Sequence, residues 1–237
     1  MPKGEKGLMK SSSKTIKEAG KRRVLIVDDH TVLREGLALV INAQPDLLVC
    51  GEAATVAEGL RVVAAVRPDI ALIDLSLAGG SGLELVKDLK VQYPNLSTLV
   101  LSLHDEALYA ERVLRAGARG YIMKRASTTE LLAAIRKVLN GEIYLSEAME
   151  SAVVRQALGK REPPTSSDPL EQLSDRELEV FQLLGEGHGT REIAQQLGLS
   201  MKTVSCYRQN IQTKLQLKDA AGLMQRAVHW AANLRAD

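Results

Sequence analysis

Three aspartates follow two apolar runs, at positions where buried strands would end. The run at 24–27 leads directly into Asp28 and Asp29, and the run at 70–73 ends on Asp74. Four consecutive apolar residues are typical of a strand that is covered on both faces, as in a parallel sheet. Ligands of such sheets bind at the carboxyl ends of the strands. If the two strands are neighbours, the three carboxylates converge, and their repulsion favours a bound hard cation, most simply Mg2+.

A hydroxyl and an ammonium group occupy equivalent positions after two later apolar runs. Ser102 follows the run at 99–101, and Lys124 follows the run at 121–123. Any single carboxylate of the set is more often a helix cap or a solvated side chain. The shared position of all these groups after successive strands predicts instead one polar pocket at the carboxyl edge of a sheet.

The elements that must position this pocket alternate along the first 140 residues. Short apolar runs predict strands at 24–27, 47–52, 70–74, 97–101 and 120–123. Amphipathic stretches predict helices at 31–41, 57–66, 82–92, 105–116 and 128–140, and capping-box patterns stand at Ser81–Glu84 and Ser127–Glu130. Alternation of strand and helix indicates a parallel sheet. Five such units predict an α/β domain with a flavodoxin-like (CheY-like), doubly wound, five-stranded parallel sheet.

The pattern becomes wholly helical after a segment rich in proline and polar residues. Residues 146–158 predict an added helix, and residues 159–169 contain three prolines and indicate a linker. A third capping box at Ser174–Glu177 opens a helical region, with further helices expected at 191–197, 201–215 and 219–234. A short helix, a glycine-containing turn and a longer helix form a helix-turn-helix pattern. We therefore expect a basic tail at 1–23, the α/β domain at 24–145, a connecting helix and linker at 146–170, and an all-α helix-turn-helix domain at 171–237.

Composition is that of a soluble chain that can bury two modest cores. It has 237 residues, 45% of them hydrophobic, and no apolar run approaches the roughly 20 residues that span a bilayer. The N-terminus lacks the apolar region of a signal peptide, so the expected location is cytoplasmic, with no membrane partner. Cys50 and Cys206 form no metal spacing and predict free thiols. Residues 1–23 carry a charge of +6 within a total of +2, which leaves about −4 for the rest and indicates a disordered basic tail.

Residues 24 to about 140 resemble the receiver domain of two-component response regulators. The resemblance rests on five dispersed positions, Asp28, Asp29, Asp74, Ser102 and Lys124. It implies that a sensor histidine kinase phosphorylates Asp74, that the three aspartates hold Mg2+, and that Lys124 pairs with the phosphoryl oxygens. It also implies that Ser102 and Tyr121 are the switch residues. A carboxylate that attacks a phosphoryl group needs charge neutralisation, which Mg2+ and a lysine supply.

Three further residues bear on this resemblance: Ala78, His30 and His104. Ala78 stands where the family usually has a proline, so the rigidity of that loop is in question. His30 is either a metal ligand or, more commonly for this position, a residue at the start of a helix. His104 matches a position that influences the access of hydrolytic water in receivers.

The segment from Leu173 to about Val228 resembles the LuxR/NarL type of helix-turn-helix domain. Four blocks match in order, beginning at Leu173, Arg191, Ser200 and Asn210. Independently, residues 193–218 contain four Lys or Arg and no Asp or Glu, which favours contact with a phosphate backbone, although a solvated basic face has the same composition. Val204, Ile211 and Leu215 form the expected buried stripe of the recognition helix. The predicted DNA-binding residues are Lys202, Thr203, Ser205, Cys206, Arg208, Gln209 and Lys214.

The two resemblances together imply a transcriptional response regulator that is not an enzyme. Its expected partners are a sensor histidine kinase, double-stranded promoter DNA, and a second copy of the chain when phosphorylated or bound to DNA. An enzyme on the same fold is disfavoured, because no glycine-rich phosphate loop follows the first strand. The alternative is a phosphorylation-independent DNA-binding regulator whose receiver is a protein-interaction domain.

Overall fold

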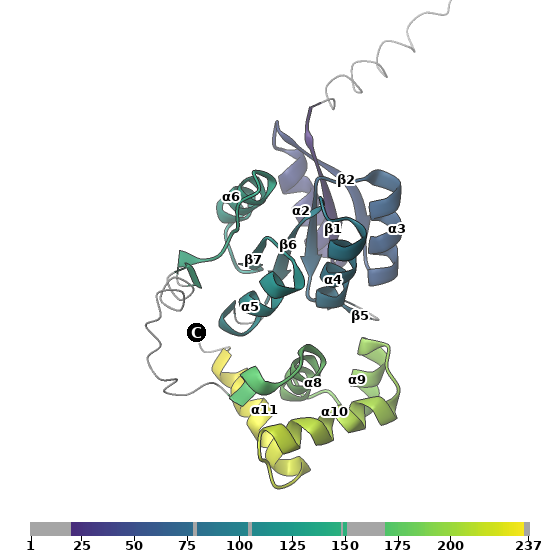
Figure 1. Ribbon diagram of the computed structural model, residues 1–237, viewed down its shortest axis with the longest axis vertical. Coiled ribbons are helices and arrows are strands. Elements are labelled where there is room, and N and C mark those ends of the chain that lie inside the picture. The colour runs from purple at the N-terminus through teal and green to yellow at the C-terminus, as the bar shows by residue number, and fades with distance from the viewer. Residues whose placement is uncertain (1–19, 78–79, 104–105, 148, 151–168, 235–237) are drawn as a thin grey trace, which may run out of the picture.

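The computed structural model contains an α/β domain followed by an all-α domain (Figure 1). It describes residues 20–77, 80–103, 106–147, 149–150 and 169–234. The expected tail up to residue 19 lies outside the described residues, and so do residues 151–168 of the expected connecting helix (146–158) and linker (159–169). None of the helices in the described part combines the length and apolar character that a bilayer span requires.

Five parallel strands form the sheet of the α/β domain, as the sequence predicts. They are β1 (Arg22–Val27), β2 (Leu47–Ala53), β3 (Ile70–Asp74), β6 (Ser97–Ser102) and β7 (Gly120–Met123), in the order β2-β1-β3-β6-β7. The central strand, β3, is buried at all of its five positions. This is the strand order of a flavodoxin-like sheet.

Helices cover both faces of this sheet because successive strand residues point to opposite sides. On one face, α2 (Thr31–Asn42) and α6 (Thr128–Leu139) contribute side chains to a core that includes Val24 and Ile26. On the other face, α3 (Val56–Val66), α4 (Gly82–Gln92) and α5 (Glu106–Ala116) pack with Leu25 and Val27. Alternate residues of β1 thus belong to two separate cores.

A small antiparallel hairpin follows Asp74, and the sequence did not predict it. It consists of β4 (Ser76–Leu77) and β5 (Gly80–Ser81). Gly82 comes next, and a Cβ atom there would lie 1.9 Å from the carbonyl oxygen of Asp74, so only glycine allows this close approach of two backbone segments. Ala78, the departure from the receiver pattern, lies outside the described residues.

The all-α domain is the predicted helix-turn-helix. After a 3-10 turn at Pro169–Gln172 it contains α8 (Asp175–Gly185), α9 (Thr190–Leu197), α10 (Met201–Lys214) and α11 (Ala220–Leu234). Gly198 ends α9 in the left-handed conformation (φ 66°), and the side chain of Ser200 then caps α10. Phe181 of α8 packs against Trp230 of α11, with ring centroids 5.6 Å apart. The tight turn therefore sets α10 across the α8–α11 pair.

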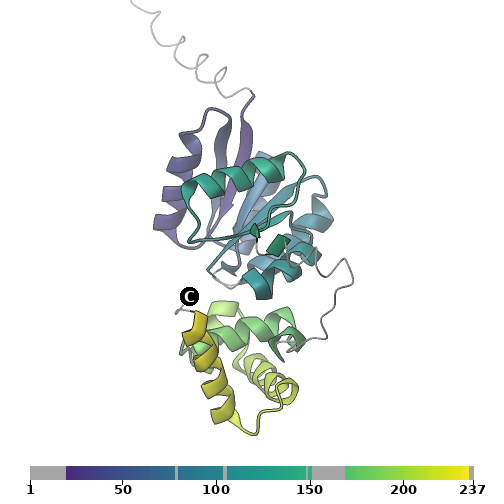
Figure 2. The same cartoon turned by 90° about the vertical axis from the view of Figure 1, so that its left-hand side faces the viewer.

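The two domains pack through α8, which lies against the α4–α5 side of the α/β domain (Figures 1 and 2). The buried apolar cluster between the sheet and helices α3, α4 and α5 continues into the helical domain, where it includes Phe181 and Leu183.

The capping box predicted at Ser81–Glu84 is wrong: Ser81 makes no side-chain cap. Its hydroxyl donates to Glu179 instead, and Glu84 pairs with Arg176. The other two predicted capping boxes are present.

Candidate functional site

The carboxylates of Asp28 and Asp74 converge at the carboxyl edge of the sheet, as predicted. Asp28 follows β1 and Asp74 ends β3, and these two strands are neighbours. Lys124, which follows β7, places its Nζ 2.7 Å from Asp74 Oδ2 and 2.8 Å from Asp28 Oδ2. The three side chains are between 3% and 6% exposed. One ammonium group therefore bridges two buried carboxylates.

Burial dominates the electrostatics of this pocket. It raises the pKa of Asp74 to about 6; Lys124 opposes this rise, and the nearby Asp28 adds to it. Burial alone would lower the pKa of Lys124, but the two carboxylates outweigh burial and raise it. Asp28 and Asp74 thus both favour the protonated form of Lys124. Two carboxylates around one ammonium, with Asp29 beside them, leave a net negative charge.

The residues of the pocket fit a hard divalent cation. Asp28, Asp29, His30 and Asp74 each offer a ligand atom, and these atoms lie within 4.8 Å of one another. Asp29 Oδ1 is buried and makes no hydrogen bond in the described part of the chain, although His30 Nδ1 lies 2.8 Å away. Carboxylate oxygens are the ligands that Mg2+ prefers, and a cation would satisfy the orphaned oxygen. His30 occupies the N-cap position of α2, as expected of a residue at the start of a helix. Its role as a metal ligand stays a prediction.

The two expected switch residues lie in the strands beside the pocket. Ser102 ends β6, the neighbour of β3, and is fully buried. Tyr121 lies on β7 opposite Val100 and is also fully buried, so the aromatic ring occupies the inward position. His104 lies outside the described residues.

Arg34 supports the pocket, and the sequence analysis missed it. Its Nη1 donates to the backbone carbonyl of Asp28 at 2.5 Å, and its Nε lies 3.2 Å from Glu52 Oε2. The side chain is only 14% exposed. It fixes the backbone that carries Asp28, but nothing in the spacing of a single arginine on a helix could have indicated this.

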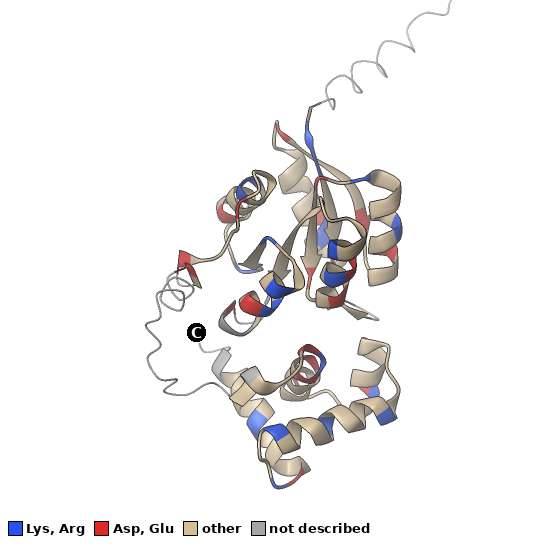
Figure 3. Cartoon of the chain, in the orientation of Figure 1, with Lys and Arg blue, Asp and Glu red and all other residues tan. Residues whose placement is uncertain are grey.

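The recognition helix α10 has the predicted division into a buried and an exposed face. Val204 and Ile211 are fully buried, whereas Leu215 is only partly buried. The exposed residues include Lys202, Ser205, Cys206 and Gln209. Positive charge without acidic residues runs along this helix (Figure 3), and α8 lies between it and the α/β domain (Figures 1 and 2).

Three further predicted DNA-binding residues have contacts within the domain. Thr203 Oγ1 lies 2.8 Å from Ser200 Oγ at the start of α10. Arg208 Nη1 donates to Thr190 Oγ1 at 2.5 Å, which ties α10 to α9. Lys214 Nζ lies 2.6 Å from Glu177 Oε2, so its charge is already paired.

Comparison with known proteins identifies both domains. Residues 24–136 match the model of the response regulator receiver domain, and residues 171–227 match that of the bacterial regulatory proteins of the luxR family. The chain is 38% identical over 209 residues to the oxygen regulatory protein NreC of Staphylococcus aureus (strain bovine RF122 / ET3-1), covering 87% of this chain and 96% of that protein. NreC of Staphylococcus haemolyticus (strain JCSC1435) is 35% identical with the same coverage.

Solved structures agree with this assignment. A LuxR-family two-component response regulator from Aurantimonas sp. SI85-9A1 has a TM-score of 0.55 and 30% identity, covering 58% of this chain and 99% of that one. RcsB from Salmonella enterica serovar Typhimurium, bound to promoter rprA in the presence of phosphomimetic BeF3-, has a TM-score of 0.62 at 24% identity, covering 86% of this chain and 97% of that one, and shows the shared fold. The chain therefore belongs to the two-component response regulators that join a receiver domain to a LuxR-type helix-turn-helix domain.

Proposed function

We propose that Asp74 is the phosphoacceptor of this response regulator and that its phosphorylation controls promoter binding by α10. A receiver domain implies a histidine kinase as partner, and a LuxR-type helix-turn-helix binds DNA. The observation that carries the assignment of Asp74 is the bridge from Lys124 Nζ to Asp74 and Asp28 at the carboxyl edge of the sheet. The protein acts in the cytoplasm as a regulator rather than as an enzyme.

In phosphoryl transfer, a carboxylate oxygen of Asp74 attacks the phosphorus of a phosphohistidine. The P–O bond forms as the P–N bond breaks, and the donor imidazole leaves with the bonding electrons and takes up a proton. Mg2+, held by Asp28, Asp29 and Asp74, supplies charge neutralisation when bound. Lys124, which now contacts Asp74 Oδ2, moves its positive charge to the phosphoryl oxygens. The hydroxyl of Ser102 donates a hydrogen bond to one of them.

Phosphorylation then acts as a shift between two receiver states. Ser102 and Tyr121 report the change, since they lie on the two strands beyond β3. Both are buried, so any movement of one changes the packing of the sheet edge.

In the proposed complex with DNA, α10 lies in the major groove. Lys202, Arg208 and Lys214 contact phosphates, the base-reading residues are Ser205, Cys206 and Gln209, and Thr203 belongs to the same DNA-binding set. Two linked modules gain affinity through effective concentration, so a homodimer is the DNA-bound form. RcsB, a structural neighbour with a similar fold, was solved bound to promoter rprA, which supports promoter DNA as a partner.

The decisive experiment combines labelling with DNA-site selection. Acetyl phosphate with Mg2+ should label the wild type and Asp88→Asn, an exposed aspartate on α4, but not Asp74→Asn. Selection of DNA sites with and without the phosphodonor then tests the coupling between the domains. DNA binding that is the same in both conditions favours the alternative, a phosphorylation-independent regulator whose receiver is a protein-interaction domain.

A further inference from the structure

A cavity of about 610 Å³ lies between the phosphoacceptor pocket and the DNA-binding domain. Asp74 and Lys124 line it from the receiver. Leu183 of α8, Leu197 of α9 and Trp230 of α11 line it from the other side. The DNA-binding domain therefore forms one wall of the space into which the side chain of Asp74 opens.

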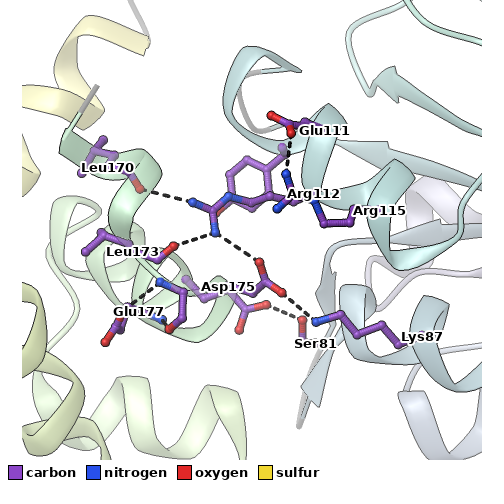
Figure 4. A network of polar contacts seen from close by, with 12 residues as sticks. Ser81, Lys87, Glu111, Arg112, Arg115, Leu170, Leu173, Asp175 and Glu177 are labelled. Atoms are coloured by element: carbon purple, nitrogen blue, oxygen red, sulfur yellow. Dashed lines mark hydrogen bonds and ion pairs between the residues drawn. The ribbon is translucent and has the colours of Figure 1, made fainter. Parts of the chain in front are cut away.

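Arg112 of α5 is the centre of the contact that holds this wall in place (Figure 4). Its Nη1 donates to the carbonyl of Leu173 at 2.7 Å and lies 3.1 Å from Asp175 Oδ1, while Nη2 donates to the carbonyl of Leu170 at 3.3 Å. Lys87 of α4 reaches the other oxygen of Asp175 at 2.7 Å. The Arg112 side chain is only 13% exposed, so its contacts are shielded from water.

A second group of contacts involves residues that line the cavity itself. The buried phenol of Tyr109 donates to Gln182 Oε1 at 2.9 Å, and burial holds the pKa of this tyrosine well above its ordinary value. The hydroxyl of Ser81, in the hairpin that follows Asp74, donates to Glu179. Hydrogen bonds from Tyr109 and Ser81 thus add to those of Arg112 in holding α8 against the receiver.

This contact leaves the DNA-reading face of α10 open. Lys202, Ser205 and Gln209 are exposed while α8 is docked. The docked domain therefore restricts access to Asp74 more directly than access to DNA. A folded donor protein is many times larger than the cavity, since a single α-helix is already about 10–12 Å in diameter. A cavity of this size accommodates a small molecule.

We propose that the docked DNA-binding domain selects the phosphodonor of Asp74 by size. Small phosphodonors such as phosphoramidate enter the cavity of the docked form. Phosphohistidine carried on a folded protein reaches Asp74 only after α8 leaves the receiver. The proposal rests on Asp74 being the phosphoacceptor, as proposed above. Because coupling between two sites is reciprocal, whatever favours separation of the domains also favours transfer from a protein donor.

The test compares two arginines of the same helix in the full-length protein. Arg112→Ala removes the central contact, whereas Arg115→Ala changes a side chain that is 73% exposed and pairs with Glu111 of its own helix. Trp230, the only tryptophan of the chain, reports docking through quenching of its fluorescence by acrylamide. We expect stronger quenching in Arg112→Ala than in the wild type, and no change in Arg115→Ala. Tyr109→Phe, which removes one hydroxyl, is a second and milder variant.

Labelling of each variant is then measured with phosphoramidate and with a phosphorylated histidine-phosphotransfer domain. We expect Arg112→Ala to accept phosphate from the protein donor about tenfold faster than the wild type does, because a larger fraction of the molecules has the DNA-binding domain separated from the receiver. The rate of labelling by phosphoramidate should change by less than about twofold. Arg115→Ala should match the wild type with both donors.

The outcomes separate this proposal from the assignment of Asp74. A protein donor that labels the wild type and both docking variants at the same rate, or labels none of them, overturns selection by size. Quenching that stays unchanged in both docking variants overturns it as well. Failure of phosphoramidate to label the wild type counts instead against Asp74 as the phosphoacceptor.

Discussion

The proposed phosphoacceptor pocket and the proposed DNA contact of α10 both set lysine against negative charge, but in opposite surroundings. Lys124 is 6% exposed and has two carboxylate oxygens within 2.8 Å. Lys202 is exposed on α10. Charges interact strongly in a buried site, whereas salt screens charges on the surface. The pocket should therefore depend sharply on single residues, and the recognition helix should distribute its affinity over many.

The largest effect is expected from Lys124→Ala. The change leaves Asp28 and Asp74 as adjacent buried carboxylates without their ammonium, and breaking such a buried pair costs about 3–5 kcal/mol of unfolding free energy. Urea unfolding followed by circular dichroism at pH 7 without divalent cations measures it. Lys90→Ala, an exposed lysine on α4, is the control and should lose little.

Two additions sharpen this prediction. Mg2+ should restore part of the lost stability, because a cation replaces the missing charge. Asp28→Asn in the Lys124→Ala background should do the same by removing one of the repelling carboxylates. Strictly additive losses in the double variant would contradict the bridged arrangement.

A smaller effect is expected from the core side of the recognition helix. Ile211→Ala removes a fully buried side chain and should cost about 2–4 kcal/mol. Cys206→Ala, on the exposed face of the same helix, should change stability by less than about 0.5 kcal/mol. Urea unfolding monitored by Trp230 fluorescence compares the two. Similar losses at both positions would mean that α10 does not bury Ile211 and expose Cys206.

The pocket was predictable because its residues follow strands whose pattern is local. A strand covered on both faces leaves a continuous apolar run, so the bounds predicted at 70–74 match β3 (Ile70–Asp74). Parallel pairing then brings the ends of such runs to one edge of the sheet. Thus the convergence of Asp28, Asp74 and Lys124 could be predicted from two things, where the apolar runs end and which strands are neighbours.

The contacts between the domains were not predictable in this way. Ser81 and Glu84 have the spacing of a capping box, but Glu179 and Arg176 of another domain compete for them. Arg112 has no local pattern at all, and its partners lie about 60 residues away along the chain. A single sequence carries no signal for a pairing that depends on where two separately folded surfaces meet.

Substitutions of the lysines that are proposed to bind DNA should have modest and unequal effects on DNA binding. Lys202→Ala should weaken binding to all DNA sequences and reduce the salt slope of binding by about one unit, as expected for one lost phosphate contact. Lys214→Ala should reduce it by less, since Glu177 already neutralises part of that charge. DNA-binding titrations over a range of salt concentrations measure both slopes. Equal slopes for the two variants would show that Lys214 leaves Glu177 when DNA binds.

The smallest effect is expected from Glu177→Gln, in the stability of the DNA-binding domain. Burial would raise the pKa of Glu177, but hydrogen bonds from Lys214 and from Ser174 outweigh burial and hold it below the ordinary 4.5. A carboxyl whose folded pKa is lowered stabilises the fold above its ordinary pKa, and this contribution disappears as the pH falls through the folded value. Because Lys214 is 39% exposed, solvent screens the pair, and we expect a loss of about 1 kcal/mol at pH 7. Urea unfolding monitored by Trp230 should show this loss at pH 7 and a shrinking difference from the wild type below pH 4.5. A difference that stays constant from pH 7 into the acid range would assign the stabilisation to the shape of the side chain rather than to its charge.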